Sequence, residues 1–526
     1  MKSLTDVKKL TWIHLLAAFI AIKLLFHLYV NGLWSFHRDE LLYLALGRHL
    51  DGGFASVPPA IGFWGWFGDA VLGGSVGGVR LIATLFGTGT VVITALMARE
   101  MLPPSASGKF SVVVVGLAGL TTGAFLRPSM LFMPVVFDVF YWALLCLLFL
   151  KYLNTEKLSW LLWFGMAAGL GLLNKYTVLI LLFAMLPGLL FTKRRNLFTN
   201  KQLYLAAGFA LLIFSPNIAW QAAHKFPVFR HMGELAASQF AHVSASSFFT
   251  DQLQFHLAAA PVWLAGLYFL LFAKQALNWR IFGWMYLTVL AVLLFFSAKS
   301  YYSLGAYPVL LAAGAAWLEQ LTRDRMQWLR VALPVLMVGL GALTMPAAMP
   351  FLKPEAEARF MENLTTKLPG MKGVLRWEDG NHYALPQDFA DMLGWEEIAD
   401  VVGKTWQNIP DKSTAAIYAE HYGQAGAIGH FGKPYGVPEV LSFSDNYRYW
   451  LPDSLPANFQ TLIYVNDELG DDMPGFFEKI EKVWELDMPL SRQHGDQVYL
   501  CHSPTPAFFE RMNVAIERAG KDEEIE

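Results

Sequence analysis

A few charged and polar side chains interrupt the long apolar stretches of this sequence, and their types suit phosphate chemistry. The group comprises Asp39, Glu40, Arg127, Lys175, Arg230, His231, Lys299, Tyr301 and Tyr302. A carboxylate can take a proton from an attacking hydroxyl group or amine, and lysine or arginine can hold a phosphate group. Ionisable residues within apolar segments are costly, and those that are present usually line a polar cavity.

Each of these residues also has a purely structural explanation. Lys175 could extend its charge to a membrane surface, and Tyr301 and Tyr302 could belong to an interfacial aromatic belt. Asp39 and Glu40 could cap the helix that follows them. Considered singly, these explanations are stronger than a functional one. Considered together, the residues put acids and cations at the same end of several predicted helices, which favours a shared site.

The composition indicates the class of protein that positions these residues. Hydrophobic residues make up 55% of the 526 residues and charged residues only 16%. Soluble domains carry about 25% charged residues, so this chain is typical of integral membrane proteins. The net charge of −2 gives no indication of a nucleic-acid partner. The two cysteines, Cys146 and Cys501, support neither a disulfide framework nor a zinc site.

We predict about eleven transmembrane helices, because each span needs roughly 20 mostly apolar residues. The predicted segments are 12–34, 80–101, 111–127, 137–153, 159–174, 177–192, 203–218, 253–273, 281–298, 303–319 and 331–349. The first segment is long enough to span and has no small-residue cleavage site after it. We therefore interpret it as an uncleaved helix and not as a signal peptide.

Basic residues in alternate connections predict the orientation. Lysines and arginines gather at the N-terminus and in every second loop, for example at 193–195. Loops rich in these residues stay in the cytoplasm, so the N-terminus is cytoplasmic and eleven crossings put the tail outside. The tail mixes a helix-like segment at 386–402 with strand-like segments at 461–465 and 497–501. We expect a transmembrane catalytic domain over 1–349 and an extracytoplasmic α+β domain over 350–526.

Several short motifs resemble those of a known family. Arg38-Asp39-Glu40-Leu41-Leu42-Tyr43, followed by Pro58-Pro59, resembles the first outer loop of the dolichyl-phosphate-mannose–protein mannosyltransferase-like family. Similar motifs stand in order along the rest of the chain, at 169–177, 215–231, 299–308, 384–395, 422–428 and 435–436. The family comprises bacterial membrane glycosyltransferases of the C-type fold, and aminoarabinose transferases that act on lipid A are related to it.

The resemblance implies a function and a location. The protein would move a sugar from a polyprenyl-phosphate donor to a lipid, glycan or protein acceptor at the outer face of the bacterial inner membrane. Asp39 would be the catalytic base, with Glu40 orienting it or acting in its stead, and direct displacement with one base predicts inversion at the anomeric carbon. The donor phosphate would be bound by Lys175, Lys299, Arg127, Tyr301, Tyr302, Arg230 and His231.

One departure from the family pattern bears on metal use. The family often has His or Lys directly before the Pro-Pro pair, whereas this chain has Val57, which removes one phosphate or metal contact. We predict no metal site and name no certain cofactor; a divalent cation stays open, but the sequence gives it no support.

Two other classes of protein stay open. One is a membrane transporter or flippase with an extracytoplasmic sensing domain. The chain has no internal repeat and its ionisable groups lie at helix ends, which does not favour this class. The other is a non-catalytic scaffold whose tail binds a partner.

Overall fold

The computed structural model describes residues 11–238 and 244–521. The chain forms two compact units, each assembled from separate parts of the sequence. We call the first the helical unit; it comprises Met1–Asn31, Arg80–Pro216 and Ala236–Met349. We call the second the mixed unit; it comprises Gly32–Val79, Asn217–Leu235 and Pro350–Glu526. The mixed unit therefore contains the tail and also two segments from the first part of the chain.

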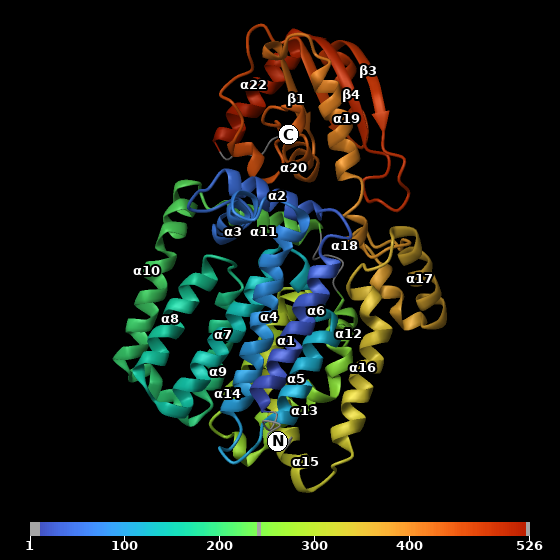
Figure 1. Ribbon diagram of the computed structural model, residues 1–526. Coiled ribbons are helices and arrows are strands. Elements are labelled where there is room, and N and C mark those ends of the chain that lie inside the picture. Colours follow the sequence, from blue (N-terminus) through green and yellow to red (C-terminus); the bar gives the residue numbers. More distant parts are fainter. Residues whose placement is uncertain (1–10, 239–243, 522–526) are drawn as a thin grey trace, which may run out of the picture. The chain divides into compact units, whose positions relative to one another are not determined.

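Apolar helices that run side by side build the helical unit (Figure 1). They are α1 (Trp12–Val30), α4 (Val76–Glu100), α5 (Lys109–Thr121), α6 (Gly123–Met130), α7 (Pro134–Thr155), α8 (Leu158–Leu172), α9 (Val178–Leu190), α10 (Lys201–Ala223), α12 (Ala245–Phe255), α13 (Ala260–Phe272), α14 (Arg280–Phe295), α15 (Tyr307–Asp324) and α16 (Leu329–Ala348). Small residues let some of these helices approach closely. A Cβ on Gly266 of α13 would lie 1.9 Å from the carbonyl oxygen of Leu310 on α15.

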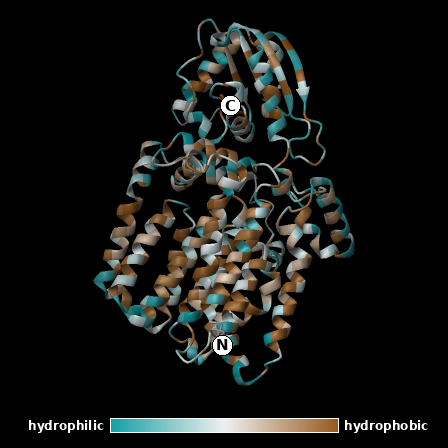
Figure 2. Cartoon of the chain, in the orientation of Figure 1, coloured by the Kyte–Doolittle hydropathy of each residue, from teal (hydrophilic) through white to brown (hydrophobic). Residues whose placement is uncertain are grey.

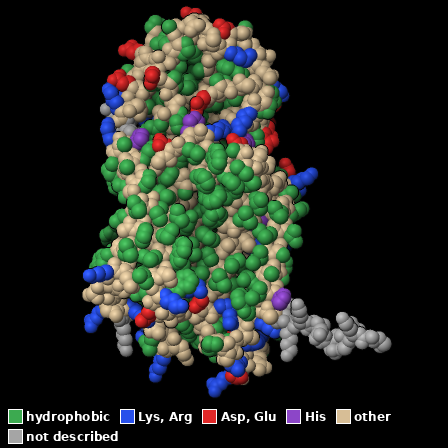
Figure 3. All heavy atoms as spheres, turned by 60° about the vertical axis from the view of Figure 1, so that its left-hand side comes forward, with side chains coloured by type: hydrophobic (Ala, Val, Ile, Leu, Met, Phe, Trp, Pro, Cys, Tyr) green, Lys and Arg blue, Asp and Glu red, His purple; other side chains and the backbone are tan. Residues whose placement is uncertain are grey.

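Large apolar side chains also cover the outside of this unit. Figure 2 shows that most of its helices are hydrophobic along their length, and Figure 3 shows a broad apolar surface on one face of the molecule. Exposed examples are Leu25, Trp163, Phe183, Leu212 and Val335. Apolar surface of this extent indicates contact with a membrane.

Among the described residues, five helices are long and apolar enough to cross a membrane: α1, α4, α7, α10 and α16. The number rises to seven if the bent pairs α5–α6 and α12–α13 each count as one span. The helices α8, α9 and α14 are apolar but shorter. Each of the eleven predicted segments coincides with one of these helices or pairs, or with α15. The number of eleven crossings stays a prediction.

Two segments that were predicted as continuous helices are broken. Segment 111–127 divides into α5 and α6, bent by 57°, because the backbone of Thr122 is extended. Segment 253–273 divides into α12 and α13, bent by 71°, with a break at His256. Pro261 near the start of α13 has no N–H group and favours a helix start at this point.

The mixed unit contains a small sheet with helices around it (Figure 1). The strands are β1 (Ala415–Ala419), β2 (Thr461–Asn466), β3 (Phe477–Glu485) and β4 (Gln497–Pro504). Their order is β1-β2-β4-β3, with β1 and β2 parallel and the other pairs antiparallel. The helices are α2 (Arg38–Arg48), α3 (Ala60–Ala70), α11 (Pro227–Ser238), α17 (Pro354–Lys367), α18 (Gln387–Ala390), α19 (Trp395–Gln407), α20 (Tyr422–Phe431), α21 (Met473–Phe476) and α22 (Pro506–Gly520).

The α+β character predicted for the tail is confirmed. Strands β2 and β4 cover the two strand-like segments of the sequence. The helix-like segment 386–402 divides at Gly394, whose φ of +92° favours glycine and ends the short α18 turn before α19 begins. Glycine also lets α20 pack directly on α2, since a Cβ on Gly426 would lie 2.9 Å from Leu41. This close packing joins the N-terminal Asp39 motif to the tail within one unit.

Candidate active site

Asp39 lies in the first turn of α2, and the local sequence determines where this helix begins. The Nδ1 atom of His37 accepts a hydrogen bond from the Asp39 backbone N–H at 3.1 Å. Glu40 Oε2 accepts one from the His37 backbone N–H at 2.8 Å. This arrangement is a capping box, and the side chain of Glu40 is fully buried in it. Glu40 therefore stabilises the start of the helix that carries Asp39.

Two neighbours orient the Asp39 carboxylate. The Tyr422 hydroxyl group, in the first turn of α20, donates a hydrogen bond to Asp39 Oδ1 at 2.7 Å. Arg38 Nε lies 3.5 Å from the same oxygen, and 28% of the Asp39 side chain is exposed. The carboxylate is thus held through its Oδ1 atom, and the side chain is partly exposed.

The charges around Asp39 favour its ionised form. Burial alone would raise the pKa of Asp39, but the charges of His37 and Arg38 outweigh this effect and hold the pKa below its ordinary value. The Tyr422 hydrogen bond acts in the same direction. Burial and the negative charge of Asp39 raise the pKa of Tyr422 well above its ordinary value, so its hydroxyl group stays protonated and can donate.

A set of ion pairs fixes Arg38 beside Asp39. Arg38 Nε lies 3.8 Å from Asp391 Oδ1, and Arg492 Nη1 lies 3.1 Å from Asp391 Oδ2. Glu378 Oε2 also lies 3.8 Å from Arg38 Nη2 and 3.9 Å from Arg492 Nη1. Asp391 is almost fully buried, and a buried carboxylate needs such partners. The tail residues therefore position the guanidinium group that keeps Asp39 ionised.

The site residues predicted from the sequence did not include Tyr422, Asp391 or Arg492. Tyr422 and Asp391 stand in motifs that carry the family resemblance, and this is the signal that could have found them. Arg492 lies outside these motifs. Its pairing with Asp391 depends on how the tail folds, which no local pattern expresses.

In the helical unit, four of the predicted donor-binding residues lie together. Lys175 follows α8, and its Nζ lies 5.2 Å from the ring centre of Tyr301 and 4.8 Å from that of Tyr302. Lys299 Nζ lies 5.9 Å from the ring centre of Tyr301. These are cation–π distances. We call these four residues the lysine–tyrosine cluster. Asp138 of α7 is close enough for its charge to act on Lys175.

The remaining predicted phosphate ligands lie elsewhere. Arg127 of α6 donates from Nη2 to the carbonyl oxygen of Ala347 on α16, at 2.6 Å. Arg230 and His231 lie on α11 in the mixed unit, with Arg230 Nε 4.0 Å and His231 Nδ1 3.9 Å from carboxylate oxygens of Glu234. The predicted set is thus divided between the two units, and Arg230 and His231 share a unit with Asp39.

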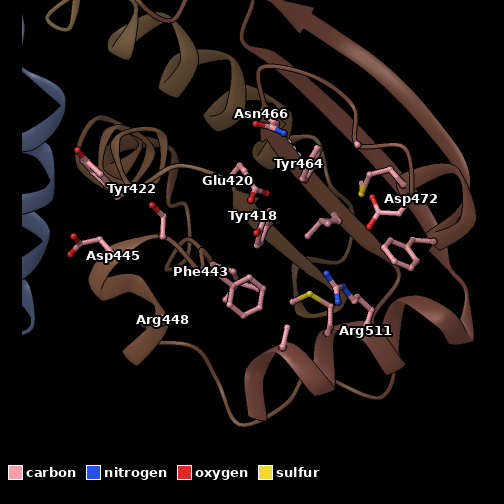
Figure 4. Close-up of a pocket in the computed structure, with 18 of the residues that line it drawn as sticks. Tyr418, Glu420, Tyr422, Phe443, Asp445, Arg448, Tyr464, Asn466, Asp472 and Arg511 are labelled. Atoms are coloured by element: carbon pink, nitrogen blue, oxygen red, sulfur yellow. Dashed lines mark hydrogen bonds between the residues drawn. The ribbon is translucent and has the colours of Figure 1, made fainter. Parts of the chain in front are cut away.

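Arg230 and His231 line a cavity of about 990 Å³ within the mixed unit. Figure 4 shows side chains from the β1 and β2 strand ends, from the 443–448 segment and from α22 around this cavity. Tyr422, which binds Asp39, is one of the lining residues. The cavity therefore extends to a direct partner of Asp39.

A metal centre would need several His, Cys, Asp or Glu side chains close together. Within residues 11–238 and 244–521, no group of three such side chains has the arrangement to hold a metal ion.

Comparison with known proteins gives a family match and two structural matches. Residues 56–220 match the family Dolichyl-phosphate-mannose-protein mannosyltransferase. The fold is similar to that of ArnT from Cupriavidus metallidurans in the apo state, with a TM-score of 0.59, and of the same protein bound to undecaprenyl phosphate, with a TM-score of 0.60. Both matches have 14% sequence identity and cover 93% of this chain, and 97% and 98% of the ArnT chains. No curated protein matches the sequence.

The protein is thus a helical membrane protein with a small C-terminal sheet, and it has the fold of ArnT. The match over residues 56–220 confirms that this part of the chain resembles the dolichyl-phosphate-mannose–protein mannosyltransferase family. At 14% identity, the structural likeness establishes the fold alone.

Proposed function

We propose that the protein is a membrane glycosyltransferase that moves a sugar from a polyprenyl-phosphate donor to an acceptor, with Asp39 as the catalytic base. The observation that carries this proposal is the state of Asp39. Its carboxylate is held by Tyr422 and Arg38, has a lowered pKa and is partly exposed. A general base must be unprotonated and within reach of the proton that it takes.

The related proteins support the donor class. The family is described as acting with dolichyl-phosphate-mannose, and ArnT has been captured with undecaprenyl phosphate. Both molecules are polyprenyl phosphates or their sugar derivatives. By its likeness to the mannosyltransferase family and to ArnT, we expect the sugar to be mannose or aminoarabinose. Lys175 and Lys299 are suited to the phosphate group, because each ammonium group is a compact positive charge and the two are close enough for their charges to act on each other.

The proposed chemistry is a direct displacement. An acceptor hydroxyl group attacks the anomeric carbon, its proton passes to Asp39, and the polyprenyl phosphate leaves. The leaving phosphate gains negative charge as the bond breaks, and Lys175 and Lys299 stabilise that charge. One displacement with one base inverts the anomeric configuration; retention would need a second carboxylate as the nucleophile. Glu40 is buried in the capping box, which favours an orienting role for it over proton transfer.

The proposal includes an orientation in the bacterial inner membrane, with the N-terminus in the cytoplasm and the tail in the periplasm. We expect a cysteine introduced at the exposed position Asp471 to react in intact cells with a membrane-impermeant thiol reagent. The native thiols of Cys146 and Cys501 are buried, so the unmodified chain is the control. Labelling that occurs only after lysis would mean that the tail is in the cytoplasm.

The test of function is product formation from defined donors. Purified protein is incubated with a panel of polyprenyl-phosphate sugars and candidate acceptors, and mass spectrometry identifies any glycosylated product. We expect transfer from at least one donor, with inversion seen by NMR of the new linkage. Solute flux across protein-containing vesicles without any sugar transfer would overturn the proposal in favour of a transporter.

A further inference from the structure

The 990 Å³ cavity of the mixed unit reaches the carboxyl ends of two parallel strands. Glu420 directly follows β1, and Asn466 is the last residue of β2. Ligands of α/β sheets commonly bind outside the carboxyl ends of parallel strands. A volume of about 990 Å³ is near the upper end of the range of about 300–1,000 Å³ for small-molecule sites. The cavity therefore has room for a ligand larger than a single sugar ring.

One wall of the cavity is aromatic. Tyr418 of β1 and Tyr464 of β2 are register partners, and their rings stack at 5.8 Å with an angle of 8° between their planes. Phe443 packs against Tyr418 at 5.9 Å. Aromatic rings of this kind offer flat apolar faces, and the C–H face of a sugar ring packs well on such a face.

The rest of the lining carries hydrogen-bonding groups of both charges (Figure 4). The carboxylates are Glu234, Glu420, Asp445, Asp467 and Asp472, and the guanidinium groups are those of Arg230, Arg448 and Arg511. Carboxylates accept hydrogen bonds from hydroxyl groups, and guanidinium groups donate to hydroxyl and ring oxygens. Asn466 Nδ2 donates to the Tyr464 hydroxyl at 3.0 Å, which joins the polar lining to the aromatic wall.

Two lining residues connect the cavity to Asp39. The Tyr422 hydroxyl group donates a hydrogen bond to Asp39 Oδ1, and Asp445 is close enough for the charge of Asp39 to act on it. Asp445 has a φ of +49°, a left-handed conformation that is uncommon outside glycine. Such conformations cluster at functional sites. A ligand in this cavity would therefore have access to the neighbourhood of the Asp39 carboxylate.

The sheet edge beside the cavity does not suit an extended peptide. β1 is an edge strand, and a peptide could bind there by adding a strand. The edge is already occupied, because Ala419 N–H donates to the Leu441 carbonyl oxygen at 3.0 Å and Leu441 N–H donates to that of Ile417 at 2.9 Å. A ligand in the cavity would therefore contact side chains and not a free strand edge. The combination of aromatic rings and carboxylates suits a carbohydrate.

We propose that this cavity binds a glycan acceptor and presents one of its hydroxyl groups to Asp39. The inference rests on the proposed function and deepens it by naming the acceptor class. In the reaction, a bond forms between the glycan hydroxyl oxygen and the anomeric carbon of the donor sugar. The bond between that carbon and the phosphate oxygen breaks, its electron pair leaves with the polyprenyl phosphate, and the hydroxyl proton goes to Asp39.

Packing alone explains the aromatic wall but not the charged lining. Tyr418, Tyr464 and Phe508 belong to the hydrophobic core of this unit, so their substitution would disturb folding. Glu420, Asp472 and Arg511 are exposed. Glu420 also forms a hydrogen bond with the hydroxyl group of Tyr418, and the amide oxygen of Gln can still accept that bond. These residues are therefore the positions at which ligand binding can be tested without loss of the fold.

The experiment measures equilibrium binding of the full-length protein in detergent to arrays of short oligosaccharides and, in parallel, of short peptides. The test variants are Glu420→Gln and Asp472→Asn. The matched control is Glu478→Gln, an exposed position on β3 outside the cavity. Size-exclusion elution and the thermal unfolding midpoint show whether each variant is folded. Two test variants at separate positions guard against a local disturbance at either one.

We expect the wild-type protein to bind a set of oligosaccharides, and each test variant to weaken this binding about 10- to 100-fold, the usual effect of losing a hydrogen bond to a charged group. Glu478→Gln should bind as the wild type does. No oligosaccharide binding, binding of peptides in its place, or binding that both test variants retain would each overturn the inference.

Binding in this assay requires no donor and no transfer, which separates the two proposals. Glycan binding without sugar transfer from any donor would contradict the proposed function and leave the glycan site standing. Sugar transfer with normal acceptor KM in Glu420→Gln and Asp472→Asn would contradict the glycan site and leave the function standing.

Discussion

In the helical unit the lysines of the lysine–tyrosine cluster face aromatic rings, whereas in the mixed unit Asp39 lies among charged and hydroxyl groups. Lys175 and Lys299 contact Tyr301 and Tyr302 through ring faces. Asp39 is held by Tyr422 and Arg38, and Arg38 in turn by Asp391. The difference has a physical reason. Ionisable groups in apolar surroundings are costly, so a membrane helix bundle retains few of them, whereas a water-exposed domain can support a network.

The comparison suggests different tasks for the two regions. A ring face stabilises a cation weakly, by about 0.5–2 kcal/mol. The carboxylate of Asp138 offsets part of the charge of Lys175, and the second lysine leaves the cluster with positive charge that can bind an anion. A carboxylate fixed by directional partners keeps one orientation, which proton transfer requires. We therefore propose that the helical unit binds the donor phosphate and that the mixed unit carries out proton transfer.

The largest effect should come from Asp39→Asn. An amide cannot take the acceptor proton, so we expect kcat for sugar transfer to fall about 10²- to 10⁴-fold, the usual contribution of general-base catalysis. Membrane insertion and the thermal unfolding midpoint should change little, because Asn still accepts the Tyr422 hydrogen bond. Asp51→Asn, at an exposed carboxylate just beyond α2, is the control and should keep full activity.

Glu40→Gln distinguishes the two acids of the motif. Gln can also complete a capping box, so this variant should fold and keep most of its activity. Near-normal turnover in Asp39→Asn together with a large loss in Glu40→Gln would mean that Glu40 is the base. Normal turnover in both variants would exclude the proposed mechanism.

The next effect should come from the lysine–tyrosine cluster. Lys175→Ala and Lys299→Ala each remove a charge-assisted contact to the donor phosphate, which typically costs about 1.5–3 kcal/mol. We expect donor affinity to fall roughly 10- to 100-fold, with acceptor KM nearly unchanged. Turnover at saturating donor should also fall, because the phosphate gains charge in the transition state. Titration with a non-hydrolysable donor analogue measures the binding change.

Lys157→Ala is the matched control for these variants. Lys157 is exposed at the start of α8, on the same helix that leads to Lys175. It should bind the analogue normally. Unchanged affinity in both Lys175→Ala and Lys299→Ala would mean that the two lysines only extend their charges to the membrane surface, and the contrast between the units would lose its functional meaning.

Some of this arrangement could be predicted from the sequence and some could not. Apolar runs of sufficient length predict where helices lie, because the side chains of such a run must be buried in the protein or face lipid along its whole length. The same runs give no sign of the extended backbone at Thr122 or the break at His256, since hydropathy does not depend on backbone angles. The strand β2 was predictable because its residues are mostly β-branched, aromatic or aliphatic, and β4 because it contains the run Val498-Tyr499-Leu500.

The site residues follow the same division. Asp39 and Lys175 could be selected as candidates from the sequence, because a charge in an apolar stretch is costly and is usually retained for a reason; their roles stay predictions. The pairing of Lys175 with Tyr302 and of Asp39 with Tyr422 was not, because each joins residues far apart in the chain. Such pairs depend on how helices pack, and packing contacts leave no local pattern in one sequence.

The smallest effect should come from Tyr422→Phe, which removes only the hydroxyl group that binds Asp39 Oδ1. A hydrogen bond to a carboxylate favours the charged form, so its loss raises the pKa of Asp39 towards the ordinary value. The base is needed ionised, and the acid side of the pH profile of kcat/KM should therefore move to higher pH. Because His37 and Arg38 continue to lower this pKa, we expect the shift to be less than one unit, with less than about tenfold loss of activity near neutral pH. Tyr383→Phe is the control, since it removes a similar hydrogen bond to the exposed Asp379 and should leave the profile in place. A pH profile that is unchanged in Tyr422→Phe would mean that Tyr422 does not tune Asp39, and a shift to lower pH would contradict the assignment of Asp39 as a base that works in its ionised form.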